Sequence, residues 1–221
     1  GHYEKAGGYI SMKLYEEKYP TLHSEAYFNN RMTQYFDSFR IVYAGEREFP
    51  VEEAVRYQRK KNAIACVKAS DLAELGQIVS VRMQNGTMDI DTRQNVCFTL
   101  ERTGELHRIE EDRFHRLLEP AKDPMPADYC RKIPYVPRVK GDKDGSTHLL
   151  TEYVHMYLPT DAFCIYAKKL TQGVKIFPVW DEDGYMTGRA GDYLAASVDD
   201  LHNIFIETEQ NLLNYFEEKG L

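Results

Sequence analysis

The second half of this chain repeats the pattern of the first half. Residues 64–119, laid over residues 162–217 at a constant offset of about 98 positions, are identical at nine positions. Apolar residues also fall on apolar residues, and the turn at Asn85-Gly86 falls on the turn at Asp183-Gly184. We interpret the pattern as an internal duplication, in which two copies of one small unit share a core or a groove.

Each copy is typical of short strands joined by turns and closed by a helix. In the first copy we expect strands at 64–68, 78–83, 96–100 and 106–109, followed by a helix over 110–118. In the second copy we expect strands at 163–167, 175–180, 193–197 and 203–206, followed by a helix over about 207–218. Asn85-Gly86 is a strong signal for a two-residue hairpin turn.

The region before the first copy predicts two helices. Aromatic residues and Met32 recur on one face over 24–39, which favours an amphipathic helix. Pro50 is followed by acidic residues and then by Arg59-Lys60-Lys61, the charge order that suits a helix dipole. Between these helices, Ile41–Tyr43 predicts a short strand.

These elements together predict an α+β fold, with two tandem antiparallel β units, each closed by a C-terminal helix, behind a helical N-terminal segment. The expected boundaries are an N-terminal extension at 1–20, a helical segment at 21–62, a first unit at 63–120, a proline-rich linker and connecting segment at 121–160, and a second unit at 161–221. The start Gly1-His2, with a methionine at Met12, suggests that some of residues 1–11 are not native.

Composition narrows the class of protein. The net charge of −7 argues against a general nucleic-acid binder, and no apolar run is long enough for a membrane span. The four cysteines form no CxxC pair, so neither a zinc site nor a disulfide scaffold is expected. We therefore expect a cytoplasmic protein without a cofactor, with no nucleic-acid or membrane partner. Cys66 and Cys164 are expected at equivalent buried strand positions.

The second copy carries a Gly-Asp-aromatic turn that enters a strand, then a second strand, then a helix that ends in aromatic residues and glutamate. These parts are Gly188–Tyr193, Asn203–Ile206 and Leu212–Glu217. The corresponding parts of the first copy are Asn85–Asp89, Thr103–Ile109 and Phe114–Glu119. Each copy resembles the small bacterial and phage domains named for a Pro-Gly-Asp-Tyr-type motif, over about 45 residues. Ala190 stands at the usual proline, and Arg93-Gln-Asn95 replaces Gly-Asp-Tyr in the first copy. The resemblance implies a fold unit more than an activity.

Three polar clusters contain residue types that can bind a metal ion. On a helix, His148, Glu152 and His155 would share one face and suit zinc or iron. On a strand, Glu152 and His155 would face opposite sides, and the β-rich neighbourhood favours that reading. Asp142–Ser146 and Asp181–Gly184 resemble the start of a calcium loop, but they lack its bidentate glutamate, so hairpin turns explain them better. We expect no metal.

Two functions stay open at this point. The first is a binding or interaction protein, of phage or bacterial accessory type, that recognises a protein partner or a small ligand in a groove between the two units, with homodimerisation through the aromatic helix as an alternative. The second is an enzyme acting on a nucleotide or another phosphorylated small molecule at the same interface. The ligand-binding candidates are Arg93, His107, Arg189, Asp192 and Tyr193. For Asp192 and Tyr193, purely structural roles in the turn are the alternative.

Overall fold

The computed structural model describes residues 39–219, apart from residues 85, 132, 134 and 180–183. Over these described residues the fold is mainly β, with 47% strand and 17% helix, and the strands form four sheets. The predicted α+β class is therefore wrong. The helix predicted over 24–39 lies outside the described residues, except for Phe39, which begins strand β1.

The helix predicted after Pro50 is also wrong. Val51–Glu53 form a single 3-10 turn, and Val55–Arg59 form strand β2. Strand β2 is hydrogen-bonded on both sides, to β12 (Cys164–Lys169) and to β17 (Phe216–Glu218). Pairing with two distant strands outweighs the local charge pattern, because propensity is only a weak prior when tertiary contacts compete with it.

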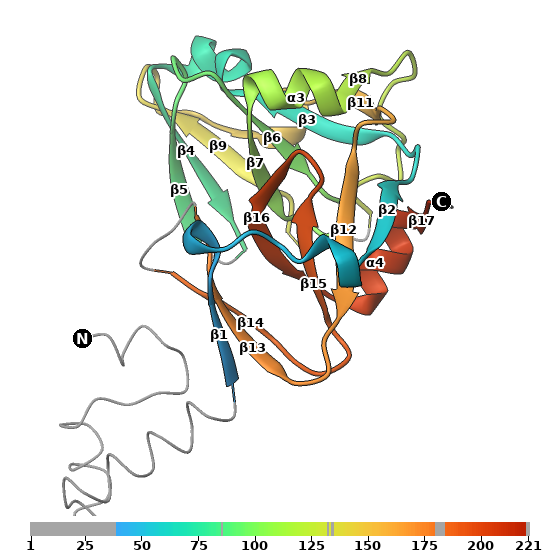
Figure 1. The fold of residues 1–221 in the computed structure, drawn as a ribbon. Coiled ribbons are helices and arrows are strands. Elements are labelled where there is room, and N and C mark those ends of the chain that lie inside the picture. The colour runs from blue at the N-terminus through green and yellow to red at the C-terminus, as the bar shows by residue number, and fades with distance from the viewer. Residues whose placement is uncertain (1–38, 85, 132, 134, 180–183, 220–221) are drawn as a thin grey trace, which may run out of the picture. The chain divides into compact units, whose positions relative to one another are not determined.

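The chain divides into two compact units (Figure 1). The central unit is residues 60–163, and the terminal unit combines the segment that ends at Arg59 with the segment that begins at Cys164. The sequence prediction placed its units one after the other along the chain. The terminal unit instead draws on both ends of the described chain.

The central unit contains two antiparallel sheets and helix α3 (Glu111–Leu117). Its five-stranded sheet has the order β7 (Leu106–Glu110), β6 (Val96–Leu100), β3 (Ile64–Lys68), β11 (His155–Pro159), β8 (Leu118–Pro120). Its four-stranded sheet has the order β10 (Thr147–Leu149), β9 (Arg138–Gly141), β4 (Ile78–Met83), β5 (Gly86–Asp91). Strands β9, β10 and β11 thus lie in the segment predicted as a linker.

Several apolar clusters hold the central unit together, and two of them join its main elements. One packs Val79 and Val81 of β4 against Phe98 of β6, so it joins the two sheets. The other packs helix α3 on the five-stranded sheet, where the Phe114 ring meets the Tyr157 ring edge-on at 4.7 Å between centroids. The buried Tyr129 hydroxyl donates to the Leu100 carbonyl and accepts from the Ala65 amide, which fastens the loop after β8 to this sheet.

The terminal unit has a five-stranded and a three-stranded sheet. The five-stranded sheet is antiparallel, with the order β16 (Asp200–Glu207), β15 (Tyr193–Ser197), β12, β2, β17. The three-stranded sheet has the order β1 (Phe39–Tyr43), β13 (Gly173–Phe177), β14 (Met186–Gly188), and β1 runs parallel to β13. Helix α4 (Glu209–Tyr215) begins after Thr208, whose hydroxyl accepts from the Asn211 amide and caps the helix.

The two units are built alike. Helix α4 follows α3 at an offset of about 98 residues, and β17 follows β8 at the same offset. The 3-10 turns at Val51–Glu53 and Leu150–Glu152 stand in the same place, just before β2 and β11. The two five-stranded sheets also have matching strand orders, which supports the duplication inferred from the sequence and extends it toward the N-terminus.

The copies exchange their first strands. Strand β2 precedes the first copy but lies in the terminal unit, between β12 and β17 of the second copy. Strand β11 precedes the second copy but lies in the central unit, between β3 and β8 of the first copy. Each five-stranded sheet is therefore completed by a strand from the other copy.

Candidate functional site

The outer side of the three-stranded sheet carries a row of aromatic rings. Tyr43 of β1 stacks on Phe177 of β13, with ring centroids 5.0 Å apart and planes 13° apart. Phe177 in turn lies 6.1 Å from the ring of Tyr185, just before β14. We call Tyr43, Phe177 and Tyr185 the aromatic face. Tyr43 is 43% exposed, and Val179, further along the chain after β13, is 51% exposed.

Strand alternation explains why these rings point away from the core. Val42, Val174 and Ile176 face inward and belong to the core of the terminal unit. Their neighbours on β1 and β13 must face the opposite way, because successive strand residues alternate between the two sides of a sheet. Tyr43 and Phe177 are also direct partners across the β1–β13 ladder, so their rings meet on the same side.

Lys175 lies beside the aromatic face and is only 1% exposed. Its ammonium nitrogen is 4.8 Å from the centroid of the Tyr185 ring, within the range of a cation–π contact. Burial lowers the pKa of Lys175 to about 8, because desolvation penalises the charged form. The aromatic face therefore contains a cation that loses its proton more easily than an ordinary lysine does.

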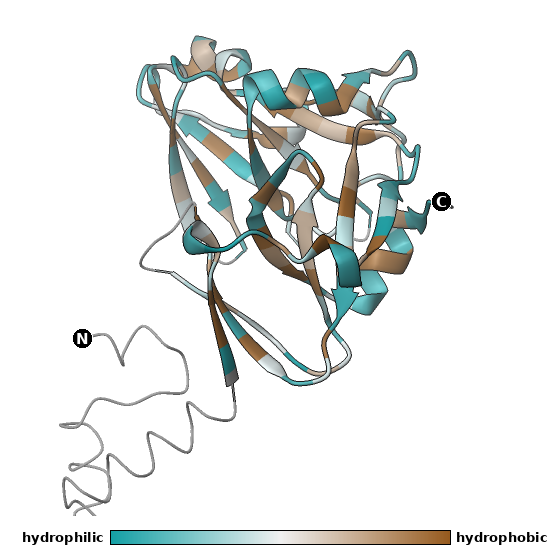
Figure 2. Ribbon diagram, viewed as in Figure 1, coloured by the Kyte–Doolittle hydropathy of each residue, from teal (hydrophilic) through white to brown (hydrophobic). Residues whose placement is uncertain are grey.

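The corresponding sheet of the central unit has a different outer side. Val79, Val81 and Val139 face the core there. The opposite side of β4, β5 and β9 carries Ser80, Arg82, Thr87, Asp89, Arg138 and Lys140, together with Ile78, which is 37% exposed. This side is therefore mainly polar or charged, and none of the three strands contains an aromatic residue. Figure 2 shows the resulting alternation of hydrophilic and hydrophobic residues, for example along β9. The Ser80 hydroxyl donates to Asp89 at 2.7 Å, so even this polar side is internally satisfied.

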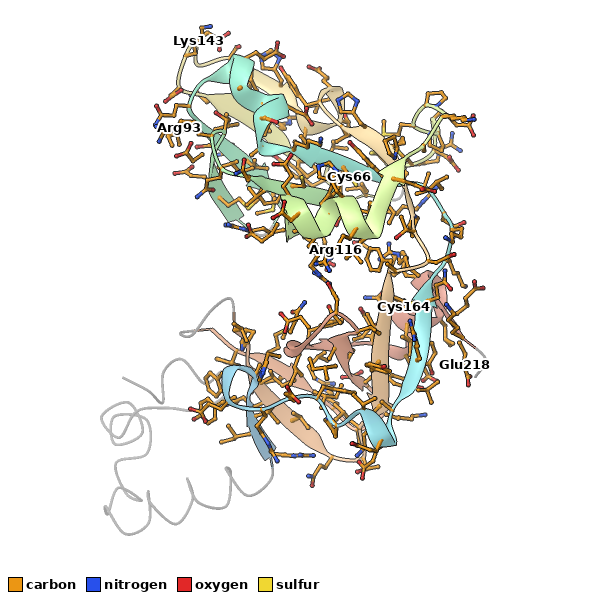
Figure 3. All side chains as sticks on the ribbon, turned by 45° about the horizontal axis from the view of Figure 1, so that its top comes forward. Cys66, Arg93, Arg116, Lys143, Cys164 and Glu218 are labelled. Carbon is orange, nitrogen blue, oxygen red and sulfur yellow. The ribbon has the colours of Figure 1, made fainter. Side chains whose placement is uncertain are left out.

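The predicted ligand residues Arg93 and His107 lie in the central unit. The Arg93 guanidinium donates to both carboxylate oxygens of Asp91, at 3.1 and 2.9 Å, and this pairing lowers the pKa of Asp91. Figure 3 shows Arg93 at the outside of its unit. His107 Nε2 lies 3.6 Å from a carboxylate oxygen of Glu105 on an exposed edge strand. Arg93 and His107 thus each interact with a carboxylate two residues earlier in the chain.

Arg189, Asp192 and Tyr193 lie in the terminal unit, at the turn that enters β15. The Asp192 carboxylate accepts from the Arg189 amide at 2.9 Å, and Gly191 has a φ of +96°, which glycine adopts without strain. Tyr193 pairs with Glu207 of β16. These contacts give Asp192 the structural role in the turn that the sequence offered as the alternative. The structure groups the five predicted ligand residues into two local sets, one in each unit.

The possible metal cluster is split between elements. His148 lies in β10, Glu152 in a 3-10 turn and His155 in β11. His148 Nδ1 is 3.5 Å from Glu152, and its Nε2 is 2.9 Å from the Ser146 hydroxyl. No group of three or more metal-ligating side chains is found in the part of the chain that the structure describes.

The Ser146 hydroxyl also bonds Asp144, at 2.8 Å. A serine hydroxyl donates only one proton, so the Asp144 carboxylate competes with His148 for it. Ser146, Asp144 and Glu152 are exposed, and the hydrogen bonds from the Ser146 amide and then from its hydroxyl lower the pKa of Asp144. The arrangement stabilises the turn between β9 and β10, and it does not present an activated nucleophile.

The cysteines have structural positions. Cys66 and Cys164 lie on the equivalent strands β3 and β12 (Figure 3), and both are buried, as the sequence predicts. Burial raises the pKa of Cys97 to about 11, so its thiol stays protonated near neutral pH. Protonated, buried thiols are poor nucleophiles.

Two open grooves lie in the central unit. One, of about 500 Å³, is bordered by Pro120–Met125 and by Val154–Tyr157, and it includes the exposed His155. The other, of about 400 Å³, surrounds the tip of the β4–β5 hairpin and includes Arg82 and Tyr135. Neither groove contains any of the five predicted ligand residues.

Sequence reasoning missed the aromatic face. Strands at 41–43 and 175–180 were both predicted, and the alternation Lys175-Ile176-Phe177 indicates one apolar and one mixed side. The missing step was the pairing of β1 with β13, which joins positions more than 130 residues apart. Local patterns carry no signal for that pairing.

Comparisons with family models, curated proteins and solved structures find no match to this chain. Among the described residues, no helix is long and apolar enough to cross a membrane.

Proposed function

We propose that this protein binds a protein partner through the aromatic face of the terminal unit. The observation that carries the proposal is the row of Tyr43, Phe177 and Tyr185 on the outer side of a sheet whose counterpart is mainly polar and has no aromatic residue on β4, β5 or β9. Aromatic rings bury a large area with few rotatable bonds, and for that reason they are enriched in interfaces.

The shape of the face favours a protein over a small ligand. Small molecules bind in concave pockets that enclose most of their surface. The two grooves described above are lined by residues of the central unit, and none of these residues belongs to the aromatic face. A row of rings on a sheet suits a partner that offers apolar side chains over a wide area. Tyr43 is the exposed member of this row, Phe177 and Tyr185 are partly buried, and exposed apolar surface is a feature that marks protein interaction sites.

The alternative, an enzyme acting on a phosphorylated small molecule, receives less support. Arg93 is held by Asp91, and the Asp192 carboxylate is held by the Arg189 amide. In both cases a residue close in sequence already binds the polar group that such an enzyme would use to bind its substrate.

The test compares proteins captured from the source organism by three forms of the full chain. These are the wild type, a Tyr43→Ser/Phe177→Ser/Tyr185→Ser variant, and a control with Arg82→Ser/Lys140→Ser on the equivalent polar side. We expect at least one protein to bind the wild type and the control, and to lose at least tenfold in affinity for the aromatic variant. Affinity is then measured with that purified partner by calorimetry.

Thermal unfolding of all three forms shows whether the variants keep their fold, and the single Tyr43→Ala variant provides a milder change at the most exposed ring. Sedimentation of the wild type shows whether the partner is a second copy. A set of captured proteins whose affinities are the same for the wild type and the folded aromatic variant would contradict the proposal.

A further inference from the structure

The exchanged strands fill two equivalent slots. One slot lies between β3 and β8 and contains β11, and the other lies between β12 and β17 and contains β2. Tyr157 stands opposite Pro120 of β8, and Tyr57 stands opposite Glu218 of β17. Pro120 and Glu218 are themselves equivalent, so the two strands enter their slots in the same way. Each slot accepts a five-residue strand that is antiparallel to both neighbours.

The connections that carry the chain between the units are short. Four residues, Lys60–Ala63, separate β2 from β3, and four residues, Thr160–Phe163, separate β11 from β12. A connection of this length also permits an antiparallel hairpin of adjacent strands. The slot beside β3 is therefore the place that β2 would occupy in a closed copy, and the slot beside β12 is the place for β11.

The two connections differ in their contacts. Thr160 donates from its amide to the Leu117 carbonyl at 2.8 Å and from its hydroxyl to the Arg116 carbonyl at 2.7 Å, so the second connection is fastened to helix α3. Lys61 and Asp161, one from each connection, form an ion pair at 2.8 Å, and both side chains are well exposed. Exposed ion pairs contribute little to stability because water screens them. Hydrogen bonds from Asn62 to Lys60 and from Phe163 to Thr160 shape the two turns locally. The strands in their slots, and not the connections, supply most of the contacts that define the exchange.

We propose that a second copy of this chain can supply the exchanged strand, so that the protein forms strand-exchanged dimers. In such a dimer, β2 of one copy lies between β12 and β17 of the other, with the hydrogen bonds that it makes within a single chain. Because the contacts are the same, the balance between monomer and dimer depends on chain concentration and on the connections. The proposal is independent of the aromatic face and of any partner bound there.

The experiment uses two full-length forms whose native cysteines are replaced by alanine. One form carries Arg56→Cys in β2, and the other carries Tyr166→Cys in β12, at the position that pairs with residue 56. The two forms carry tags of different mass, are unfolded together, are refolded over a range of concentrations and are then oxidised. We expect a disulfide-linked heterodimer whose yield rises at least tenfold from low to high refolding concentration.

Two controls define the result. A single chain with both substitutions must form an internal disulfide at high dilution, which checks the register of β2 against β12. A form with Glu207→Cys in β16, two strands away from the slot, replaces the Tyr166→Cys form in a parallel mixture and should give no concentration-dependent heterodimer.

No heterodimer at any concentration, with the internal disulfide present in the single chain, would overturn the proposal. Absence of the internal disulfide in a chain that is folded by circular dichroism would overturn the exchange itself. If the cysteine-free background does not fold, the wild-type chain is refolded at high concentration and analysed by light scattering. A dimer that persists after dilution supports the proposal, and only monomer at every concentration contradicts it.

Discussion

The two small sheets of this protein have equivalent hairpins but opposite surface chemistry. In the central unit, the outer side of β4, β5 and β9 is mainly polar apart from Ile78, and Ser80 and Asp89 are bonded to each other. In the terminal unit, the outer side of β1, β13 and β14 carries three neighbouring rings and a buried lysine. The inner sides are apolar in both units. The contrast teaches that the fold constrains the inner side of each sheet and leaves the outer side free to diverge.

The largest expected effect tests whether the two cores are equivalent. Phe114 on α3 and Leu212 on α4 stand at matching positions and are 0% and 1% exposed. We expect Phe114→Ala to lower the free energy of unfolding by about 3–5 kcal/mol and Leu212→Ala by about 2–5 kcal/mol, because each leaves a cavity. Urea unfolding followed by circular dichroism measures both. A loss below about 1 kcal/mol in only one unit would break the equivalence.

The next effect concerns the terminal unit alone. The pKa of Lys175 falls from its ordinary value to about 8 on folding, so between about pH 8 and 10.5 the unfolded chain binds the additional proton. Below pH 8 Lys175 is charged in the folded protein, and the burial of this charge lowers the free energy of unfolding. The cost disappears as the pH rises from 8 to 10.5, so the free energy of unfolding increases over this range. We expect wild type to gain about 2–3 kcal/mol relative to Lys175→Met between pH 8 and 10.5. Parallel pH profiles for the two proteins would exclude this contribution.

A smaller effect tests the two hydrogen bonds of the Tyr129 hydroxyl, which join a loop to a sheet in the central unit. The Tyr129 hydroxyl bridges the Leu100 carbonyl and the Ala65 amide while its ring is buried. Tyr129→Phe keeps the ring but leaves both backbone groups without that partner, so we expect a loss of about 1–3 kcal/mol in unfolding free energy. Amide hydrogen exchange should become faster at Ala65 and stay unchanged in β12. Unchanged exchange at Ala65 would show that the bridge contributes nothing.

Much of the local structure could be predicted from the sequence. Strands β3, β4, β6 and β15 have the expected bounds, and α3 lies within the expected helix. These elements have dense apolar patterns and clear turn signals, so local and tertiary preferences agree.

The sequence predicted a helix where the structure has β2, because local and tertiary preferences disagree in this segment. Glu52 and Glu53 followed by Arg59 suit a helix, yet Val55–Arg59 lie between two strands that begin more than 100 residues later. The same reason hides the aromatic face, since Tyr43 and Phe177 are brought together only by the pairing of β1 with β13. The groove predicted between the copies stays a prediction.

The exchange of first strands also sets an order for the synthesis of this protein. Strand β2 leaves the ribosome about 100 residues before its neighbours β12 and β17 exist, and during that interval the complementary edges have not yet been made. The nascent chain must keep an unpaired strand, or pair it provisionally with β3, until β12 and β17 have been translated. Pairings over such long sequence separations form slowly. Strand β17 must therefore be synthesised before β2 can reach its final position between two neighbours.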